Sequence, residues 1–374
     1  MQVVFAIIMV LVSIFQLGAN EKNLPYTPVI MPNGETLSYE MDKDVKVFHL
    51  TAEPVKQEFT PGLVINCWGY NKRSPGPMIE AVEGDKVRIF VTNHLPDPTT
   101  VHWHGILLPN GMDGVTGLSQ APILPGETCK YEFTLKQHGT YMYHSHFDEV
   151  KQIGMGLMGF FIIHPKNPIQ SVDRDFAIFL HEWAIPEGSV DINPMEMSDF
   201  NYFTLNGRVY PGTDPLVVKK EEKVRIRFAN LSMDNHPMHL HGYAFTVTGF
   251  SGWTIPKSAQ YLGNTIDVVV GNTHDIEFVA NAPGDWALHC HKTHHVTSGM
   301  NHGKPMKEMA HDSDMSTNTL LSDGFPGPFG KIDMSGMFTI LKVREGITNY
   351  NDPGWYKNPV GTVAEPINVN SEKQ

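Results

Sequence analysis

The most reactive side chains of this chain are concentrated in one short segment. Cys290 stands between His289 and His291, and His295 and Met300 follow it. On an extended strand successive side chains point to opposite faces, so the two flanking histidines share one face and the thiol takes the other. A cysteine, two histidines and a distant methionine are the ligand set of a mononuclear blue copper site. The segment therefore predicts such a site, with Cys290 and His295 as strong ligands and Met300 as the weak axial one.

Three further histidine pairs precede this segment. Each has the form His-x-His, which places two imidazoles on one face of a strand. A single pair is common on protein surfaces, but four pairs, one of them enclosing a cysteine, indicate metal sites. The three pairs are His102-Trp103-His104, His144-Ser145-His146 and His239-Leu240-His241, the last of them preceded by His236.

These motifs resemble the copper signatures of the multicopper oxidases, and the resemblance extends roughly from Val47 to Val343. It implies four coppers per chain. The type 1 copper would be held by His236, Cys290, His295 and the axial Met300. The type 2 copper would be held by His102 and His239. The type 3 pair would be held by His104, His144, His146, His241, His289 and His291.

The sequence contains one unit twice. The segment Lys86–Asn93 recurs as Lys223–Asn230, and the same offset of 137 residues carries the first histidine pair onto the third. Gly139–His146 corresponds to Gly284–His291 at an offset of 145 residues. Opposite the three strong type 1 ligands the first copy has Thr99, Ser145 and Val150. We therefore expect both copies to contribute histidines to a copper cluster and only the second to hold a type 1 site.

Short β-branched and aromatic runs between Gly, Pro and Asn turns predict strands throughout the chain. Clear examples are Val87–Thr92, Lys130–Leu135, Gly159–His164, Val224–Phe228 and Asp267–Val270. This pattern favours an all-β fold of two β-sandwiches, and the resemblance implies cupredoxin-like Greek-key domains. The expected divisions are a signal peptide (1–19), a first domain (20–168), a second domain (169–347) and a C-terminal tail (348–374).

Composition and the first residues bear on partners and compartment. A formal net charge of −12 argues against nucleic-acid binding, which needs a basic face. Residues 1–15 are largely apolar and uncharged, which predicts a signal peptide cleaved after Ala19 and export to the periplasm or medium. The same segment lacks the usual Lys or Arg, so the alternative is that it is retained as a membrane anchor. Cys67 and Cys129 would form a disulfide in such a compartment or remain two separate buried thiols.

The resemblance implies a laccase-like oxidase. Such an enzyme couples one-electron oxidation of a phenol or aromatic amine to four-electron reduction of dioxygen to water. A cuprous oxidase is the alternative, since the methionines and histidines of 301–331 include soft ligands for Cu(I), unless they merely pack over the site. A copper nitrite reductase fits less well, because it uses a single type 2 copper and has its type 1 ligands in the first domain. A non-enzymatic copper-binding protein would not need a redox-tuned thiolate.

Dioxygen reduction consumes protons, so a carboxylate is expected near the cluster. Asp113, in Gly111-Met112-Asp113-Gly114, matches the family's acidic residue at this place. Its alternative interpretation is a turn aspartate. At the position of a second acidic residue found in some relatives, this chain has His294.

The division of the cluster histidines, four in each copy, also predicts an assembly. Only a short segment around Pro165 and Pro168 joins the copies, and no intervening domain could bring their histidine faces together. Head-to-tail contacts between chains that close as a ring would do so. The resemblance to two-domain relatives implies a homotrimer with clusters shared between subunits.

Overall fold

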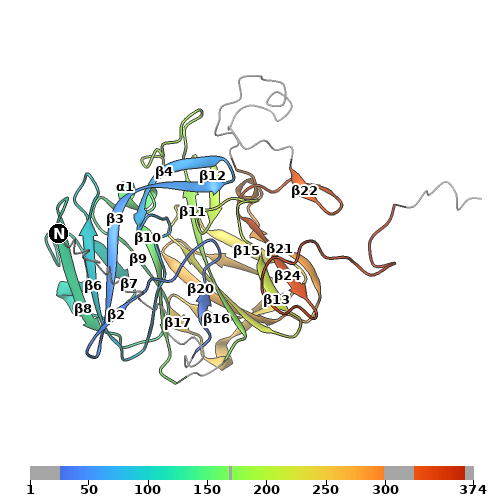
Figure 1. Cartoon of the computed structure of the whole chain (residues 1–374), viewed down its shortest axis with the longest axis horizontal. Helices are drawn as coiled ribbons and strands as arrows, with labels where there is room; N and C mark the ends of the chain where they lie inside the picture. Colours follow the sequence, from blue (N-terminus) through green and yellow to red (C-terminus); the bar gives the residue numbers. More distant parts are fainter. Residues whose placement is uncertain (1–25, 168–170, 299–323, 367–374) are drawn as a thin grey trace, which may run out of the picture.

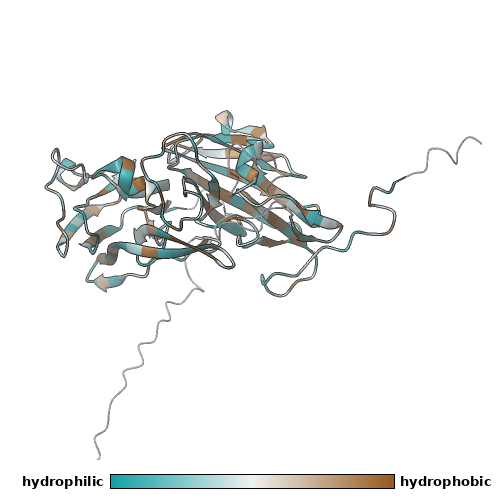
Figure 2. Cartoon of the chain, turned by 90° about the horizontal axis from the view of Figure 1, so that it is seen from above, coloured by the Kyte–Doolittle hydropathy of each residue, from teal (hydrophilic) through white to brown (hydrophobic). Residues whose placement is uncertain are grey.

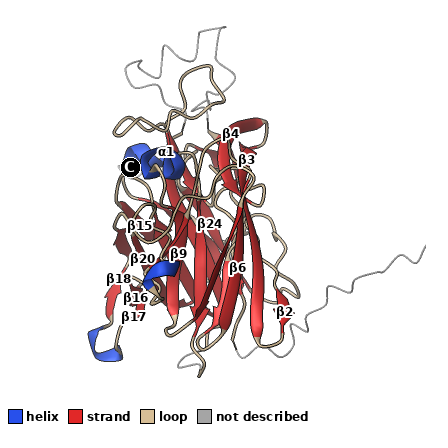
Figure 3. Ribbon diagram, turned by 90° about the vertical axis from the view of Figure 1, so that its left-hand side faces the viewer, coloured by secondary structure: helices blue, strands red, loops and turns tan. Residues whose placement is uncertain are grey.

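The computed structural model describes residues 26–167, 171–298 and 324–366. Its regular structure is almost entirely β (Figure 3), which confirms the all-β prediction. The helical elements of the described residues are short: α1 (Glu149–Gly154), η2 (Asn110–Met112), η3 (Lys257–Ala259) and η4 (Thr293–Val296). Within the described ranges, no helix combines the length and apolar character needed to cross a bilayer.

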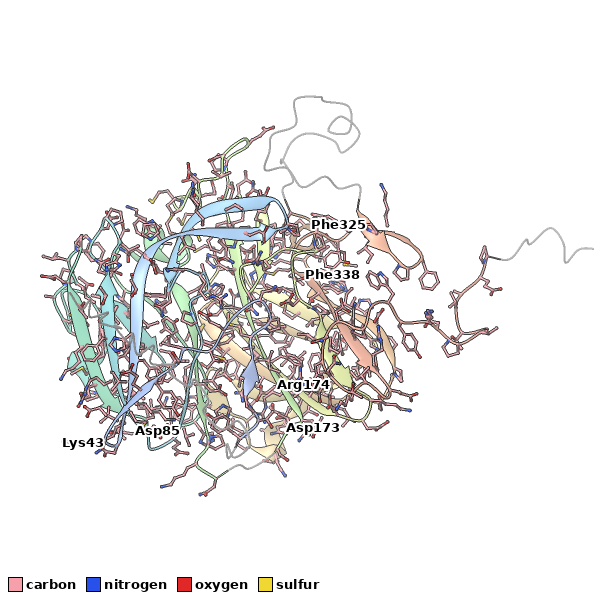
Figure 4. All side chains as sticks on the ribbon, viewed as in Figure 1. Lys43, Asp85, Asp173, Arg174, Phe325 and Phe338 are labelled. Carbon is pink, nitrogen blue, oxygen red and sulfur yellow. The ribbon has the colours of Figure 1, made fainter. Side chains whose placement is uncertain are left out.

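Two sheets packed face to face form the first copy, on the blue-green side of Figure 1. One sheet has the order β2-β3-β6-β8, with β4 added beside β3, and the other has the order β5-β10-β9-β7. The first contains β2 (Glu40–Asp42), β3 (Val45–Thr60), β4 (Leu63–Tyr70), β6 (Lys86–Asn93) and β8 (Thr128–Thr134). The second contains β5 (Ile79–Val82), β7 (Val101–His104), β9 (Gly139–Ser145) and β10 (Met158–His164). Lys43 and Asp85, which precede β3 and β6, lie at the same end (Figure 4), because these two strands run parallel from the pair Val45 and Lys86.

The second copy repeats this arrangement and enlarges it. One sheet has the order β1-β11-β14-β20-β16-β17, with β12 beside β11 and β18 beside β16, and the other has the order β13-β24-β21-β15-β19. The first contains β1 (Val29–Ile30), β11 (Arg174–Trp183), β12 (Tyr202–Leu205), β14 (Lys223–Asn230), β16 (Phe245–Phe250), β17 (Trp253–Thr254), β18 (Tyr261–Gly263) and β20 (Asn272–Val279). The second contains β13 (Leu216–Lys219), β15 (His236–Leu240), β19 (Thr265–Val268), β21 (Gly284–Cys290) and β24 (Phe338–Arg344). A hairpin of β22 (Phe325–Gly327) and β23 (Gly330–Ile332) precedes β24.

The predicted strand segments fall on observed strands, with differences at two ends: Leu135 lies just beyond β8, which ends at Thr134, and a second segment ends early. The segment predicted as Asp267–Val270 is instead β19, which ends at Val268 because the chain then turns at Gly271 (φ +70°) into β20. Alternation places Val87, Ile89 and Val91 of β6 in the core, where each such side chain contributes roughly 1.5–3 kcal/mol. Apolar residues accordingly run along the strands inside both sandwiches (Figure 2).

The order of the strands in the first sheet decides whether Cys67 and Cys129 can form a disulfide. Cys67 on β4 and Cys129 on β8 are separate thiols. Strands β3 and β6 lie between them. Neighbouring strands are about 4.8 Å apart, so the two backbones are roughly 14 Å apart. That exceeds the span of a disulfide, which needs Cα atoms within about 7 Å.

The two copies pack directly on each other. Met142 and Phe160 of the first copy join Ala177 and Phe179 of the second in one buried apolar cluster. The segment before the first sandwich also crosses over, because β1 pairs in parallel with β11 of the second copy. A shared apolar cluster and a strand pairing therefore hold the two copies against each other.

Candidate metal centre

Three side chains of the second copy converge in its interior. The Nδ1 atoms of His236 and His295 are 3.0 Å apart. The Sγ atom of Cys290 lies 3.8 Å from the first and 3.5 Å from the second. All three residues are fully buried. They come from the start of β15, the end of β21 and the short helix η4, so the sandwich brings together the strong type 1 ligands that the sequence predicts.

This donor set fits copper. Burial lowers the pKa of His295 to about 3 and the pKa of His236 well below its usual range, which keeps both imidazoles neutral and able to bind a metal. Burial also raises the pKa of the Cys290 thiol to about 12, so a metal must displace a proton to bind there. One soft sulfur and two imidazoles in a dry site are the ligands of a blue copper centre. The predicted axial ligand Met300 lies outside the described residues.

The outer nitrogens of the two rings have different surroundings. His236 Nε2 lies 2.7 Å from Ser232 Oγ, whereas His295 Nε2 has no hydrogen-bond partner among the described residues. The Oε1 atom of Glu182 faces both, at 3.7 Å from His236 Nε2 and 3.6 Å from His295 Nε2. Burial and the neighbouring Asp234 raise the pKa of Glu182 to about 7.

Sequence reasoning missed Glu182 and Ser232. A signal for the former existed, because Glu182 lies within a run of apolar residues on β11 that is buried along almost its whole length. A carboxylate at such a position requires a polar partner.

The first copy has no metal ligands at the corresponding place. Gln152 Oε1 accepts hydrogen bonds from Thr99 Oγ1 at 2.7 Å and Ser145 Oγ at 2.5 Å, and Gln152 Nε2 donates one to the Pro98 carbonyl at 2.7 Å. The structure thus confirms that Thr99 and Ser145 occupy this place, but the third residue is Gln152. Val150 is wrong for that position, since its side chain is 48% exposed on the outer face of α1.

The four histidines of the first copy form one group at the end of its second sheet. His104 Nδ1 lies 3.2 Å from His144 Nε2, and the rings of His102 and His146 are 5.5 Å apart between centroids. The Nδ1–H of His102 donates to the Asp113 carbonyl at 2.8 Å. Since a carbonyl only accepts, the Nε2 lone pair of His102 remains available for a metal.

The second copy repeats this geometry. His241 Nε2 lies 3.1 Å from His289 Nε2, and the rings of His239 and His291 are 5.5 Å apart. His239 donates through Nδ1 to the Asn264 carbonyl at 2.7 Å. This contact corresponds to the one that His102 makes with the Asp113 carbonyl in the first copy. The paired strands have the same register, with His239 opposite His289 as His102 is opposite His144. The histidine sets are therefore equivalent half-sites, as the internal repeat predicts.

The two half-sites do not meet within the chain. No hydrogen bond or ring contact of the described residues joins a histidine of one set to a histidine of the other. On the side of the second copy, His104 lies beside the turn at Gly271. A Cβ atom added to Gly271 would be 3.9 Å from His104 Cε1. His241 and His291 are exposed.

Asp113 lies beside the first half-site. Its Oδ1 atom is 3.4 Å from His102 Nδ1, and its side chain is about a third exposed. The next residue, Gly114 (φ +85°), passes so close to the strand that a Cβ would lie 1.8 Å from the Val101 carbonyl oxygen. This close approach, which only glycine permits, holds the carboxylate against the histidine.

Comparison with known proteins agrees with this geometry. A family model described as multicopper oxidase matches residues 52–168, and a second model with that description matches residues 186–304. Laccase-1 of Cryptococcus neoformans is 31% identical over 52% of this chain and 38% of its own length. Copper resistance protein A of Escherichia coli is 44% identical over 29% of this chain and 18% of its own length.

Among solved structures, the Blue Copper Oxidase from Nitrosomonas europaea superposes with a TM-score of 0.65 and 27% identity, over 79% of this chain and 85% of that one. The curated relatives are longer, and the chain spans 34%, 38% and 44% of three of them. The two family models together cover more than half of the sequence, each on one copy of the repeat. The chain therefore belongs to the multicopper oxidase family.

Proposed function

We propose that this protein is a laccase-like copper oxidase that couples one-electron oxidation of a phenol or aromatic amine to four-electron reduction of dioxygen to water. The observation that carries this proposal is the buried convergence of Cys290, His236 and His295, joined through the backbone to His289 and His291. When bound, copper supplies the redox chemistry, accepting single electrons at one site and delivering four to dioxygen at the other.

The residues divide between these sites as the family pattern suggests. We assign His236, Cys290, His295 and Met300 to the type 1 copper. His102 and His239 would hold the type 2 copper. Six histidines would hold the type 3 pair: His104, His144, His146, His241, His289 and His291. Support comes from backbone carbonyls that accept from Nδ1 of four of these rings and leave each Nε2 lone pair available for a metal: His102, His144, His239 and His289.

Cys290 would connect the two copper sites. Cys290 links the reductant side to the dioxygen side, because its two sequence neighbours belong to the cluster. We also propose that the two domains divide near residue 168 and that the chain is exported. Residues 1–25 and 168–170, on which these two proposals bear, lie outside the described part of the chain.

Oxygen uptake by the copper-loaded protein tests the proposed function. We expect uptake with a phenol or a phenylenediamine as reductant, in a ratio of four electrons per dioxygen. No uptake with any of these reductants or with Cu(I), in protein shown to contain four coppers, would contradict the oxidase assignment.

A cuprous oxidase is the second candidate. Methionines Met195, Met197 and Met233 are 65%, 40% and 56% exposed in the second copy, and thioethers suit Cu(I). The similarity to copper resistance protein A also favours this candidate. Faster turnover with Cu(I) than with aromatic reductants, lost on replacing Met197 and Met233 by leucine, would support it.

Asp113 would supply protons on the dioxygen side. Asp113→Asn removes the ionisable group at nearly constant shape, so reoxidation of the reduced protein by dioxygen should slow by roughly a hundredfold. Reduction by substrate should stay near normal, and the exposed Asp44→Asn variant serves as the matched control. Stopped-flow reoxidation measures the effect, and unchanged kinetics would leave Asp113 as a turn residue only.

Met300, as a weak axial ligand, would set the reduction potential more than the affinity for copper. Met300→Leu removes electron donation to the oxidised metal, so the blue band should persist while the potential rises. A redox titration followed at that band measures the shift. Complete loss of type 1 copper in this variant would contradict the axial role.

The assembly we propose is a homotrimer in which the first copy of one chain faces the second copy of the next. Support comes from the separation of the two half-sites within the chain and from the exposure of His241 and His291. Two strongly exposed apolar side chains are close in sequence to residues that contact the half-sites: Leu118, five residues after Asp113, is 79% exposed, and Leu262, two residues before Asn264, is 73% exposed. Such residues are typical of a protein interface.

A further inference from the structure

In the first copy, one buried amide joins three segments at the place that corresponds to the candidate type 1 site. This amide belongs to Gln152 on α1, which is fully buried. Its Oε1 atom accepts from Thr99, two residues before β7, and from Ser145, the last residue of β9. Its Nε2 atom donates to the carbonyl of Pro98. Gln152 therefore holds the ends of the two strands that present the four histidines of this copy.

The spacing of these polar atoms resembles that of the proposed metal ligands in the second copy. Thr99 Oγ1 lies 3.4 Å from Ser145 Oγ, and Gln152 Oε1 lies 2.7 Å from the first and 2.5 Å from the second. The three strong type 1 ligands proposed in the second copy have ligand atoms 3.0 to 3.8 Å apart. Equivalent segments thus converge in both copies. The first copy joins them by hydrogen bonds, whereas the second copy offers ligands for a metal.

Ser145 passes this constraint to a histidine of the half-site. The Ser145 carbonyl accepts a hydrogen bond from His144 Nδ1 at 2.8 Å. In the second copy the Cys290 carbonyl accepts from His289 Nδ1 at the same distance. Because His144 Nδ1 carries the proton, the lone pair of His144 lies on Nε2, which is 3.2 Å from His104 Nδ1. The orientation and the tautomer of His144 therefore depend on where Ser145 is held.

The two hydroxyls depend on Gln152 for their link to another element. Among the hydrogen bonds of the described residues, their other side-chain contacts are with each other or local, from Thr99 to the Thr100 carbonyl and between Ser145 and the backbone of Phe147. Thr99 and Ser145 are both fully buried. A buried polar group that loses its partner is unfavourable, so removal of the amide should make these segments rearrange.

We propose that Gln152 is a positioning residue of the copper cluster. Its amide holds Ser145 and the segment before β7, and thereby sets the orientation and the tautomer of His144 before any metal binds. The proposal rests on the proposed function, because the role of His144 there is to bind copper. At the equivalent place the second copy would use a metal to join the same segments, whereas in the first copy a glutamine amide suffices.

Nitrogen-15 NMR of the metal-free protein tests the tautomer directly. In the unmodified chain His144 should show one protonated and one unprotonated ring nitrogen, and its signals are identified by their loss in His144→Gln. Gln152→Met keeps the length of the side chain but removes all three hydrogen bonds, so the two nitrogen shifts of His144 should move toward a common average. Gln152→Glu should restore the original pattern, because a buried carboxyl stays protonated and can both accept and donate.

Copper titration in competition with a chelator tests the consequence for the cluster. Gln152→Met should lower the affinity for the type 2 and type 3 coppers roughly 10- to 100-fold, as is typical when the hydrogen-bonded support of a metal ligand is lost. The blue band and the affinity for type 1 copper should not change, because the proposed strong ligands lie in the second copy.

Gln57→Met is the matched control. Gln57 is a buried glutamine of β3, in the sheet of the first copy that carries none of the cluster histidines, and its Oε1 atom accepts from the Ser74 N–H at 3.4 Å. This variant should keep both the His144 tautomer and the affinity for cluster copper. Folding of every variant is checked by thermal unfolding. Gln152→Asn, which keeps an amide but shortens it by one methylene, gives the same comparison if Gln152→Met does not fold.

A single His144 tautomer in folded Gln152→Met would overturn the proposal, as would a failure of Gln152→Glu to restore it. Unchanged affinity for cluster copper, or an equal loss in Gln57→Met, would also overturn it. If the tautomer responds as expected but the unmodified protein binds no type 2 or type 3 copper, the positioning by Gln152 stands and the proposed oxidase function fails.

Discussion

Cys290→Ser is expected to abolish both the blue colour and reductant-driven oxygen uptake. The intense absorption of a type 1 site requires a thiolate ligand, and serine supplies only a hydroxyl. Serine is close to cysteine in size, so β21 should keep its register with β15 and β24, and His289 and His291 should stay in place. The variant should therefore retain most of its cluster copper. Visible spectroscopy, copper analysis and oxygen uptake measure the three consequences.

The chain offers a matched control for this change. Cys67 is equally buried but lies on β4 of the first copy, away from every proposed ligand. Cys67→Ser should keep the blue band and the activity, even if burying a hydroxyl lowers stability by about 1–3 kcal/mol. A blue band that survives in Cys290→Ser would show that the type 1 assignment is wrong.

Dissociation of the assembly is expected to abolish oxygen reduction while sparing the blue colour. The three residues proposed as strong type 1 ligands lie together in the second copy of one chain, whereas each proposed cluster would need half-sites from two chains. Leu118→Asp places a charge on an exposed apolar residue five positions after Asp113 and should prevent the proposed contact between chains. Light scattering gives the mass of the particle, and spectroscopy and oxygen uptake on the same sample give the two functional readouts.

Met41→Asp is the control for this variant. Met41 is 56% exposed on β2, in the sheet of the first copy that carries none of the cluster histidines, so the assembly and activity should persist. A monomer that reduces oxygen at the full rate would contradict shared clusters. It would also require the half-sites of one chain to approach each other, which would need the two packed copies to move apart and rearrange.

The repeat explains why so much of the site could be predicted from sequence. Predicted ligands such as His289 and Cys290 are adjacent in the sequence, and the alternation of a strand alone decides which of them share a face. The offset between copies then identifies the equivalent strands, and the observed register at His102 and His239 agrees with it.

Position 150 shows where this reasoning failed. A fixed offset of 145 residues places Val150 opposite His295, but both segments have left the strand by then. In the first copy the chain enters α1, whose period brings Gln152 inward and leaves Val150 outward, while the second copy forms the shorter turn η4. A constant offset does not hold across elements of different period.

The sequence by itself determined the β fold, the duplication and the absence of His and Cys from the type 1 place of the first copy, and it supplied the residues predicted to bind copper, because these follow from local spacing. Only the tertiary structure decided which groups surround those ligands. Glu182 reaches the predicted copper ligands His236 and His295 from the opposite sheet, and Ile153 of the first copy lines a pocket together with residues of the second copy. Contacts of this kind depend on how sheets and copies pack, and packing joins segments that are remote in sequence and carry no shared spacing.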